Sequence, residues 1–180
     1  GVHTLIFNGE IYNYRQLRQA LLNANVVLRT DGDTEAVLEG YRLWGQGVLD
    51  RLEGMYAFVL VDRRRGRALI ARDPLGIKPL YAVRRGPLFA VASEMRPLLR
   101  VVPAKPDEDA LAELLTFGWA AGAQSNLVGI ERIPGGTAIE VPLDGGATQS
   151  RCFFDILSTL EPAEDGAEET LESVPDSVEH

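Results

Sequence analysis

Cysteine and histidine are scarce in this 180-residue chain, which contains one cysteine and two histidines. One cysteine forms neither a disulfide within the chain nor a cysteine-based metal cluster. His3 and His180 stand at opposite ends of the sequence, so neither a metal site nor a histidine-based catalytic triad is indicated. Cys152 precedes Phe153 and Phe154, and these apolar neighbours favour a buried, unreactive thiol. We expect a reducing, cytoplasmic compartment.

Positive charge and long apolar runs are also in short supply. The chain has 18 Lys and Arg against 26 Asp and Glu, a net charge of −8, which argues against a nucleic-acid or anionic-membrane surface. The longest unbroken apolar run, Met55–Val61, is far shorter than the roughly 18 residues of a membrane-spanning helix. No basic segment followed by an apolar stretch indicates a signal peptide. We therefore expect no nucleic-acid and no membrane partner.

The composition is that of a folded globular domain, with 46% hydrophobic and 24% charged residues. A chain of this length buries enough surface for a core. Its last stretch, Glu161–His180, is acidic and poor in large apolar residues, and forms either a flexible linker or an amphipathic helix carrying Leu171, Val174 and Val178. We expect one domain over residues 1–154, followed by an acidic linker or helix over residues 155–180.

Short apolar runs separated by turn-rich segments predict strands with short connections. Strands that are apolar on consecutive residues are covered on both faces, and short connections favour antiparallel hairpins. A further strand pair is expected around Pro134-Gly135-Gly136, within Ile130–Val141. The expected single strands are His3–Phe7, which ends at Asn8-Gly9, then Met55–Val61, Ala68–Ala71, Leu80–Val83 and Leu88–Ala92.

Helical spacing and capping residues predict three helices and one helical turn. Together with the strands they give an α+β fold, with antiparallel sheets covered by helices. The first helix begins near Tyr14 with Asn13 as its N-cap and Gln16 completing a capping box. Asp33 can cap the second, which Gly45 ends; Asp107 opens the third, which Gly118 ends, and Ser93 can cap a helical turn.

The triplet Asn8-Gly9-Glu10 is the first candidate for chemistry. An Asn carboxamide beside a Gly N–H offers two neutral donors that can converge on one oxygen, as an oxyanion hole requires. Asn-Gly is equally typical of a simple turn. Asp33 has two interpretations as well, a helix cap or a carboxylate that holds a substrate ammonium. The residues alone leave both choices open.

A second candidate is the loop Arg72-Asp73-Pro74 with Gly76 and Lys78-Pro79. It could be an anion-binding turn. An ion pair inside a connection shaped by Pro and Gly is the favoured interpretation.

Six sequence blocks, in a fixed order, resemble a known family. They resemble the N-terminal class II glutamine amidotransferase domain of glutamine-dependent asparagine synthetases, which has an N-terminal-nucleophile hydrolase fold. The resemblance extends over almost the whole chain. The blocks are Phe7–Tyr14, Asp31–Glu35, Leu52–Phe58, Ala71–Tyr81, Ala92–Met95, and Gly129-Ile130 with Pro134–Gly136.

This resemblance implies an αββα layering and assigns roles to four residues. Asn8 and the N–H of Gly9 would form the oxyanion hole, while Glu10 and Asp33 would hold the glutamine substrate, Asp33 chiefly through its ammonium. In such enzymes the thiol of an N-terminal cysteine attacks glutamine. The released ammonia passes to a C-terminal synthetase domain, where ATP, with Mg²⁺, activates aspartate to give asparagine.

The chain also departs from that pattern. Position 1 is glycine, and neither the family's upstream stretch nor its synthetase domain has a counterpart. We expect a piece of a longer enzyme that is inactive alone, needs no cofactor itself, and has a sheet incomplete at the N-terminus, where upstream strands would pair with His3–Phe7. The alternatives are a non-catalytic amidotransferase-like scaffold of a related synthetase and a plain binding module. A homodimer is left open.

Overall fold

The computed structural model describes residues 1–118 and 125–159, and the expected tail helix with Leu171, Val174 and Val178 lies outside them. The described elements follow one another along the chain as strands, α-helices and short 3-10 helices. They are β1 (His3–Ile11), α1 (Tyr14–Asn23), α2 (Asp33–Trp44), η1 (Gly45–Arg51), β2 (Gly54–Asp62), β3 (Arg67–Arg72), β4 (Tyr81–Arg85), β5 (Leu88–Ala92), α3 (Met95–Leu98), α4 (Glu108–Phe117), β6 (Glu131–Arg132), β7 (Thr137–Pro142), β8 (Gln149–Cys152) and η2 (Ile156–Thr159).

The strands form two antiparallel sheets. The larger has the order β1-β2-β3-β7-β8, and the smaller has the order β5-β4-β6. The short turn-rich connections β2–β3 and β4–β5 are hairpins, as the sequence predicts. None of the helices in the described part of the chain is both long and apolar enough to cross a membrane.

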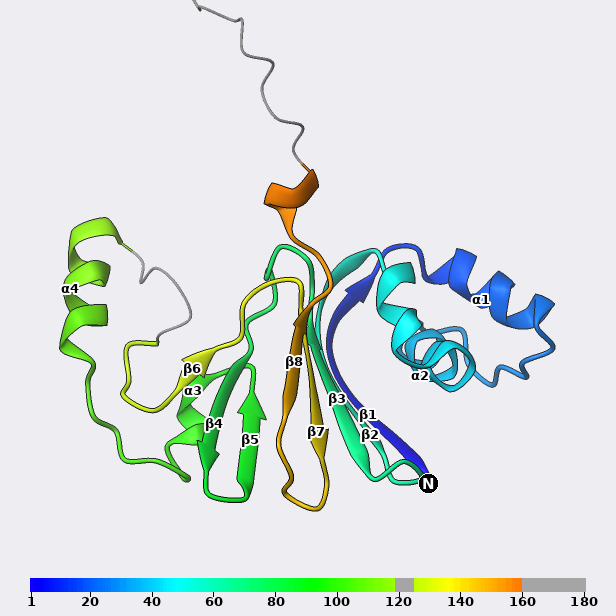
Figure 1. The fold of residues 1–180 in the computed structure, drawn as a ribbon. Coiled ribbons are helices and arrows are strands. Elements are labelled where there is room, and N and C mark those ends of the chain that lie inside the picture. Colours follow the sequence, from blue (N-terminus) through cyan, green and yellow to red (C-terminus); the bar gives the residue numbers. More distant parts are fainter. Residues whose placement is uncertain (119–124, 160–180) are drawn as a thin grey trace, which may run out of the picture.

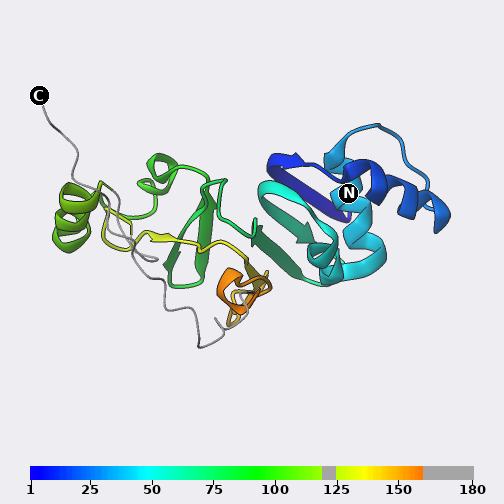
Figure 2. The same cartoon turned by 90° about the horizontal axis from the view of Figure 1, so that it is seen from above.

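The two sheets and the helices stack in four layers (Figure 1). Helices α1 and α2 pack on one face of the larger sheet through a core that includes Leu21, Val37 and Phe58. The opposite face packs on the smaller sheet, and α3 covers the outer side of that sheet. Figure 2 shows the same separation from above, with the blue and cyan elements on one side and green β4, β5 and α4 on the other. The expected αββα layering is confirmed.

The strand pair predicted around Pro134-Gly135-Gly136 is wrong in its pairing. Both strands exist, but β6 pairs with β4 in the smaller sheet and β7 pairs with β3 in the larger. Two backbone contacts divert the chain between them: the N–H of Ile133 donates to the carbonyl of Leu80, and that of Gly136 donates to the carbonyl of Asp73. The segment is a crossing between sheets rather than a hairpin turn.

Strand β1 is longer than the sequence predicts. It pairs with β2 without interruption from His3 opposite Asp62 to Ile11 opposite Gly54, so Asn8-Gly9 is extended strand and not a turn. A Cβ atom on Gly9 would lie 2.1 Å from the carbonyl oxygen of Met55. Only glycine lets the strands approach this closely, and the pairing overrides the turn preference of Asn-Gly.

Asn13 occupies the N-cap position of α1, as predicted, but makes no capping hydrogen bond. Its carboxamide donates to the carbonyl of Arg51 at 2.9 Å and accepts from the N–H of Glu53 at 3.1 Å. The predicted capping box with Gln16 is therefore wrong, because the Asn13 side chain bonds to the turn before β2 and not to the first turn of the helix. The predicted helix ends at Gly45 and Gly118 are confirmed.

Arg72 and Asp73 hold the loop that connects the two sheets. The buried Asp73 carboxylate accepts hydrogen bonds from the N–H groups of Tyr56, Ile77 and Lys78 at 3.3, 2.8 and 2.9 Å. The Arg72 guanidinium donates to the carbonyls of Lys78, Ile133 and Gly76. Backbone groups thus occupy both side chains, which supports a structural connection and not an anion-binding turn. The expected ion pair within this loop is wrong, because the Arg72 and Asp73 side chains bond to the backbone and not to a charged partner.

Candidate functional site

The candidate site lies along the outer edge of β1, the first strand of the larger sheet. Within residues 1–118 and 125–159, no strand pairs with that edge. Its amide directions follow from two hydrogen bonds: the N–H of Tyr12 donates to Glu53 on the β2 side, whereas the N–H of Ile11 donates to Asp33. Successive amides of a strand point to opposite edges. The N–H of Gly9 therefore points outward, like that of Ile11 and away from β2.

The side chain of Asn8 lies on the face of the sheet that looks toward the second sheet. Asn8 is opposite Ala57, which is buried in the core between the two sheets, and opposite residues of an antiparallel pair share a face. The Asn8 carboxamide is exposed, and its Nδ2 donates to the hydroxyl of Ser93 at 3.0 Å. Ser93 immediately follows β5 of the second sheet. Asn8 thus stands where the edge of one sheet meets the end of the other.

Asp33 is bonded to the same edge of β1. Its Oδ2 accepts the N–H of Ile11 at 3.1 Å, and its Oδ1 accepts the hydroxyl of Thr34 at 3.2 Å. The residue is half-buried. It is the first residue of α2, and the N-cap is Gly32, so the predicted cap is wrong by one position. The Asp33 carboxylate links the helix layer to β1 and does not cap the N-terminus of α2.

The structure therefore brings the four candidate residues together. Asn8, Gly9 and Glu10 are consecutive in β1, and Asp33 is bonded to the next residue along that strand. The exposed Glu10 lies two residues from Asn8 and hence on the same face. Two neutral donors, the Asn8 carboxamide and the outward N–H of Gly9, stand beside two carboxylates. Such an arrangement can stabilise an oxyanion at one point and hold a cationic group nearby.

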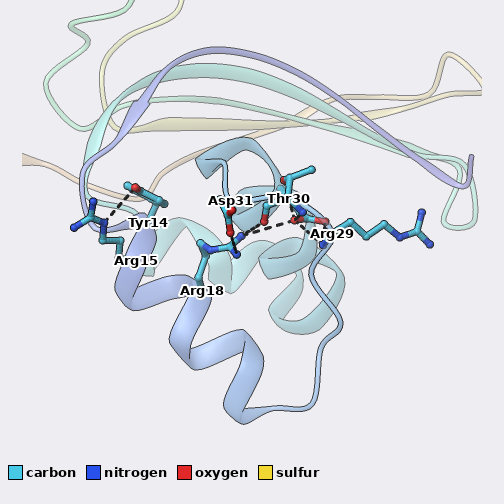
Figure 3. A network of polar contacts seen from close by, with 7 residues as sticks. Tyr14, Arg15, Arg18, Arg29, Thr30 and Asp31 are labelled. Carbon is cyan, nitrogen blue, oxygen red and sulfur yellow. Dashed lines mark hydrogen bonds and ion pairs between the residues drawn. The ribbon is translucent and has the colours of Figure 1, made fainter.

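A polar network fixes the loop that leads into α2 and its first residue, Asp33 (Figure 3). The Glu35 carboxylate accepts the N–H groups of Arg29 and Thr30, the latter at 2.7 Å, together with the Thr30 hydroxyl. Arg18 of α1 donates to the carbonyl of Thr30 and, at 2.9 Å, to the carboxylate of Asp31. Burial opposes ionisation of Glu35, but the hydrogen bonds from Thr30 and Arg29 outweigh it and lower the pKa of this carboxyl. The network orders the chain just before α2.

Cys152 is exposed, which corrects the prediction of a buried thiol. It lies on β8, whose four residues are all exposed. β8 is the edge strand at the opposite side of the larger sheet from β1. Its Sγ donates to the carbonyl of Phe154 at 3.1 Å. The only thiol of the chain is thus separated from Asn8 by the width of the larger sheet.

As for metal ions, the described residues contain no cluster of three or more His, Cys, Asp and Glu placed to hold one.

Ser93 is the residue at this site whose contact the sequence does not reveal. The sequence suggests it as a helix cap, but α3 begins at Met95 with Glu94 as its N-cap. Asn8 and Ser93 are 85 positions apart, and no local pattern links them. Their contact could be predicted only if the arrangement of the two sheets were already known.

The sequence profile of a family described as "Glutamine amidotransferase domain" matches residues 1–153. The chain belongs to this family. Among curated relatives, this amidotransferase domain is 31% identical over 176 residues to asparagine synthetase [glutamine-hydrolyzing] 1 of Bacillus subtilis, covering 97% of the chain and 28% of that protein. It is 45% identical over 101 residues to asparagine synthetase B [glutamine-hydrolyzing] of Escherichia coli, covering 55% of the chain and 18% of that protein. The chain spans well under a third of either relative.

A solved structure supports the fold. Glutamine phosphoribosylpyrophosphate amidotransferase from B. subtilis, complexed with ADP and GMP, aligns with a TM-score of 0.57 at 21% identity. The alignment covers 84% of this amidotransferase domain and 29% of that chain. This likeness bears on the fold alone, and it agrees with the α+β arrangement of antiparallel sheets and helices described above.

We predict that Glu35→Gln speeds hydrogen exchange at the amides of Arg29 and Thr30 by roughly tenfold, because hydrogen bonds to a charged acceptor are the stronger ones. Glu39→Gln, which removes a carboxylate that pairs with Arg42 on α2, is the control and should leave these amides unchanged. Exchange is measured by NMR at a common pH.

The same experiment has a pH arm. Since the folded-state pKa of Glu35 is lowered, the carboxylate holds the loop at pH values above its ordinary pKa of about 4.3 and releases it as pH falls through the lowered pKa. After correction for intrinsic exchange, wild-type protection should drop in that acidic range, whereas Glu35→Gln should show no such step. Equal protection in both proteins would refute this role of Glu35.

Proposed function

We propose that this chain is the glutamine-binding, ammonia-releasing domain of a glutamine-hydrolysing asparagine synthetase. The observation that carries the proposal is that the consecutive residues Asn8 and Gly9 present two neutral donors at the outer edge strand β1, and that Asp33 is bonded to the same edge. Membership of the amidotransferase family and the names of the relatives support the choice of glutamine.

In the proposed reaction, a thiolate attacks the side-chain amide carbon of glutamine. The carbonyl π electrons move onto the oxygen, and Asn8 and the N–H of Gly9 stabilise this oxyanion. When the tetrahedral intermediate collapses, the C–N bond breaks and the nitrogen leaves as ammonia after gaining a proton, which leaves a thioester. Water then attacks the thioester carbonyl, the C–S bond breaks, and glutamate is released while the sulfur takes up a proton and becomes the thiol again. The two donors stabilise the intermediate most while the negative charge is on the oxygen. They need no reorganisation at that stage, because they are oriented before the charge forms.

The carboxylates of Asp33 and Glu10 would bind the other end of glutamine. An ammonium placed near the end of β1 can donate charge-assisted hydrogen bonds to them. Asp33 suits this role because the N–H of Ile11 and the hydroxyl of Thr34 fix its orientation. Its interaction would be equally strong in the ground and transition states, so it would contribute to binding rather than to the chemical step.

The attacking thiol is not Cys152, which lies on the opposite edge strand of the sheet. We propose that the thiol is the N-terminal cysteine implied by the family resemblance, supplied elsewhere in the full-length protein, and that the present chain alone does not hydrolyse glutamine.

The remaining parts of the proposal concern the parent protein. Residues 1–154 form the amidotransferase domain, and residues 155–180 lead into a synthetase domain that uses ATP and Mg²⁺ to activate aspartate. The amidotransferase domain itself needs no cofactor. Its partners are glutamine and the synthetase domain, and the compartment is cytoplasmic.

Asn8→Ala in the full-length protein should lower kcat for glutamine-dependent synthesis roughly 100- to 1,000-fold with little change in KM, the usual effect of removing one oxyanion donor. Synthesis from free ammonia, which bypasses the site, should stay near wild type. Asn23→Ala, at the exposed end of α1, is the control. An unchanged kcat in Asn8→Ala would show that Asn8 is only a strand residue.

Asp33→Asn should mainly raise KM for glutamine, because the ammonium loses a charged partner that acts equally before and during the reaction. The amide keeps an oxygen that can accept the N–H of Ile11, so the end of β1 should hold. Glu39→Gln removes a carboxylate of α2 that pairs with Arg42, outside the network around Asp33, and serves as the matched control. Steady-state kinetics decide: if Asp33→Asn changes kcat and leaves KM intact, Asp33 does not bind the ammonium.

A further inference from the structure

Ser93 is the only residue to which the side chain of Asn8 makes a hydrogen bond in the described part of the chain, with Nδ2 3.0 Å from its Oγ. An amide nitrogen carries two hydrogens. One of them is directed at Ser93, and the structure records no acceptor for the other among the described residues. The contact joins the edge of the larger sheet to the end of the smaller one.

We propose that Ser93 is a positioning residue for glutamine hydrolysis, which holds the Asn8 carboxamide with its NH₂ group turned toward the oxyanion. This proposal rests on the function proposed above for Asn8. Ser93 does not touch the reacting atoms and acts only through Asn8.

An exposed Asn side chain needs a hydrogen-bond partner to fix the orientation of its carboxamide. The terminal torsion of Asn is broad, and the oxygen and nitrogen ends of its carboxamide have nearly the same shape. If the oxygen end turned toward the developing oxyanion, two negative oxygens would face each other. In the structure the Ser93 hydroxyl accepts one N–H of the carboxamide, and this contact holds the nitrogen end in place. Donors that are oriented before the reaction cost no reorganisation while the charge develops.

The backbone around Ser93 is itself well supported. The preceding residue, Ala92, is paired with Tyr81 in the second sheet. Two residues after Ser93, α3 begins, and its Leu98 is buried against the same sheet. Ser93 is half-buried and its hydroxyl makes no cap for α3, so the side chain is available to Asn8. The second sheet thus contributes a fixed anchor to a site built on the first.

The test is a double-mutant cycle in the full-length protein, with Asn8→Ala, Ser93→Ala and both together. Ser93→Ala should lower kcat of glutamine-dependent synthesis roughly threefold to tenfold, the range for one hydrogen bond, with KM near wild type. In the Asn8→Ala background it should have no further effect, since Ser93 acts through Asn8. Ser93→Thr, which keeps the hydroxyl, should restore kcat. Ser150→Ala on the exposed β8 is the control.

The outcomes separate the two proposals. If Asn8→Ala leaves kcat intact, the role of Asn8 fails, and with it the role of Ser93. If Asn8→Ala lowers kcat but Ser93→Ala does not, only the role of Ser93 fails. Additive losses in the double variant would also overturn it, because they would show that Ser93 acts independently of Asn8. An equal loss of ammonia-dependent synthesis in Ser93→Ala would show general damage and contradict positioning.

Discussion

The close pairing of β1 with β2 is the constraint on which the site depends. Gly9 faces the carbonyl of Met55, and Gly54 faces that of Glu10, so that a Cβ on either glycine would lie within 2.2 Å of the opposite backbone. Because the pairing continues to Ile11, the N–H groups of Gly9 and Ile11 point outward in a row. Among the described residues no strand pairs with the edge that the N–H of Gly9 faces, whereas the N–H of Ile11 anchors Asp33. A side chain at Gly9 would force the strands apart and disturb both.

The second sheet contributes to the candidate site that β1 of the first sheet provides. The buried carboxylate of Asp73 bonds to β2 through Tyr56 and to the loop that leads to β4 through Ile77 and Lys78. This loop sets how the smaller sheet lies on the larger, and the end of β5 then brings Ser93 to Asn8. The site is thus assembled at the junction of two layers, although three of its four candidate residues belong to one strand.

The sequence predicts the elements well and their partners less well. Apolar runs and capping residues locate most strands and the ends of α2 and α4, because those signals are local. The pairing of β6 and β7 with different sheets, and the diversion of Asn13 to the turn before β2, depend on distant backbone groups that no local pattern encodes. The resemblance selects Asn8, Gly9, Glu10 and Asp33, which the structure brings together. It does not reveal the contact with Ser93. The apolar neighbours of Cys152 wrongly suggest burial, although the residue lies on an exposed edge strand.

The structure of the full-length protein with glutamine bound would test most directly whether the outer edge of β1 is the glutaminase site. We predict that the side-chain carbonyl oxygen of glutamine lies about 2.7–3.1 Å from both the backbone nitrogen of Gly9 and Nδ2 of Asn8. The ammonium should contact the carboxylate of Asp33. Glutamine bound away from β1, or bound there with its carbonyl oxygen out of reach of both donors, would contradict this assignment.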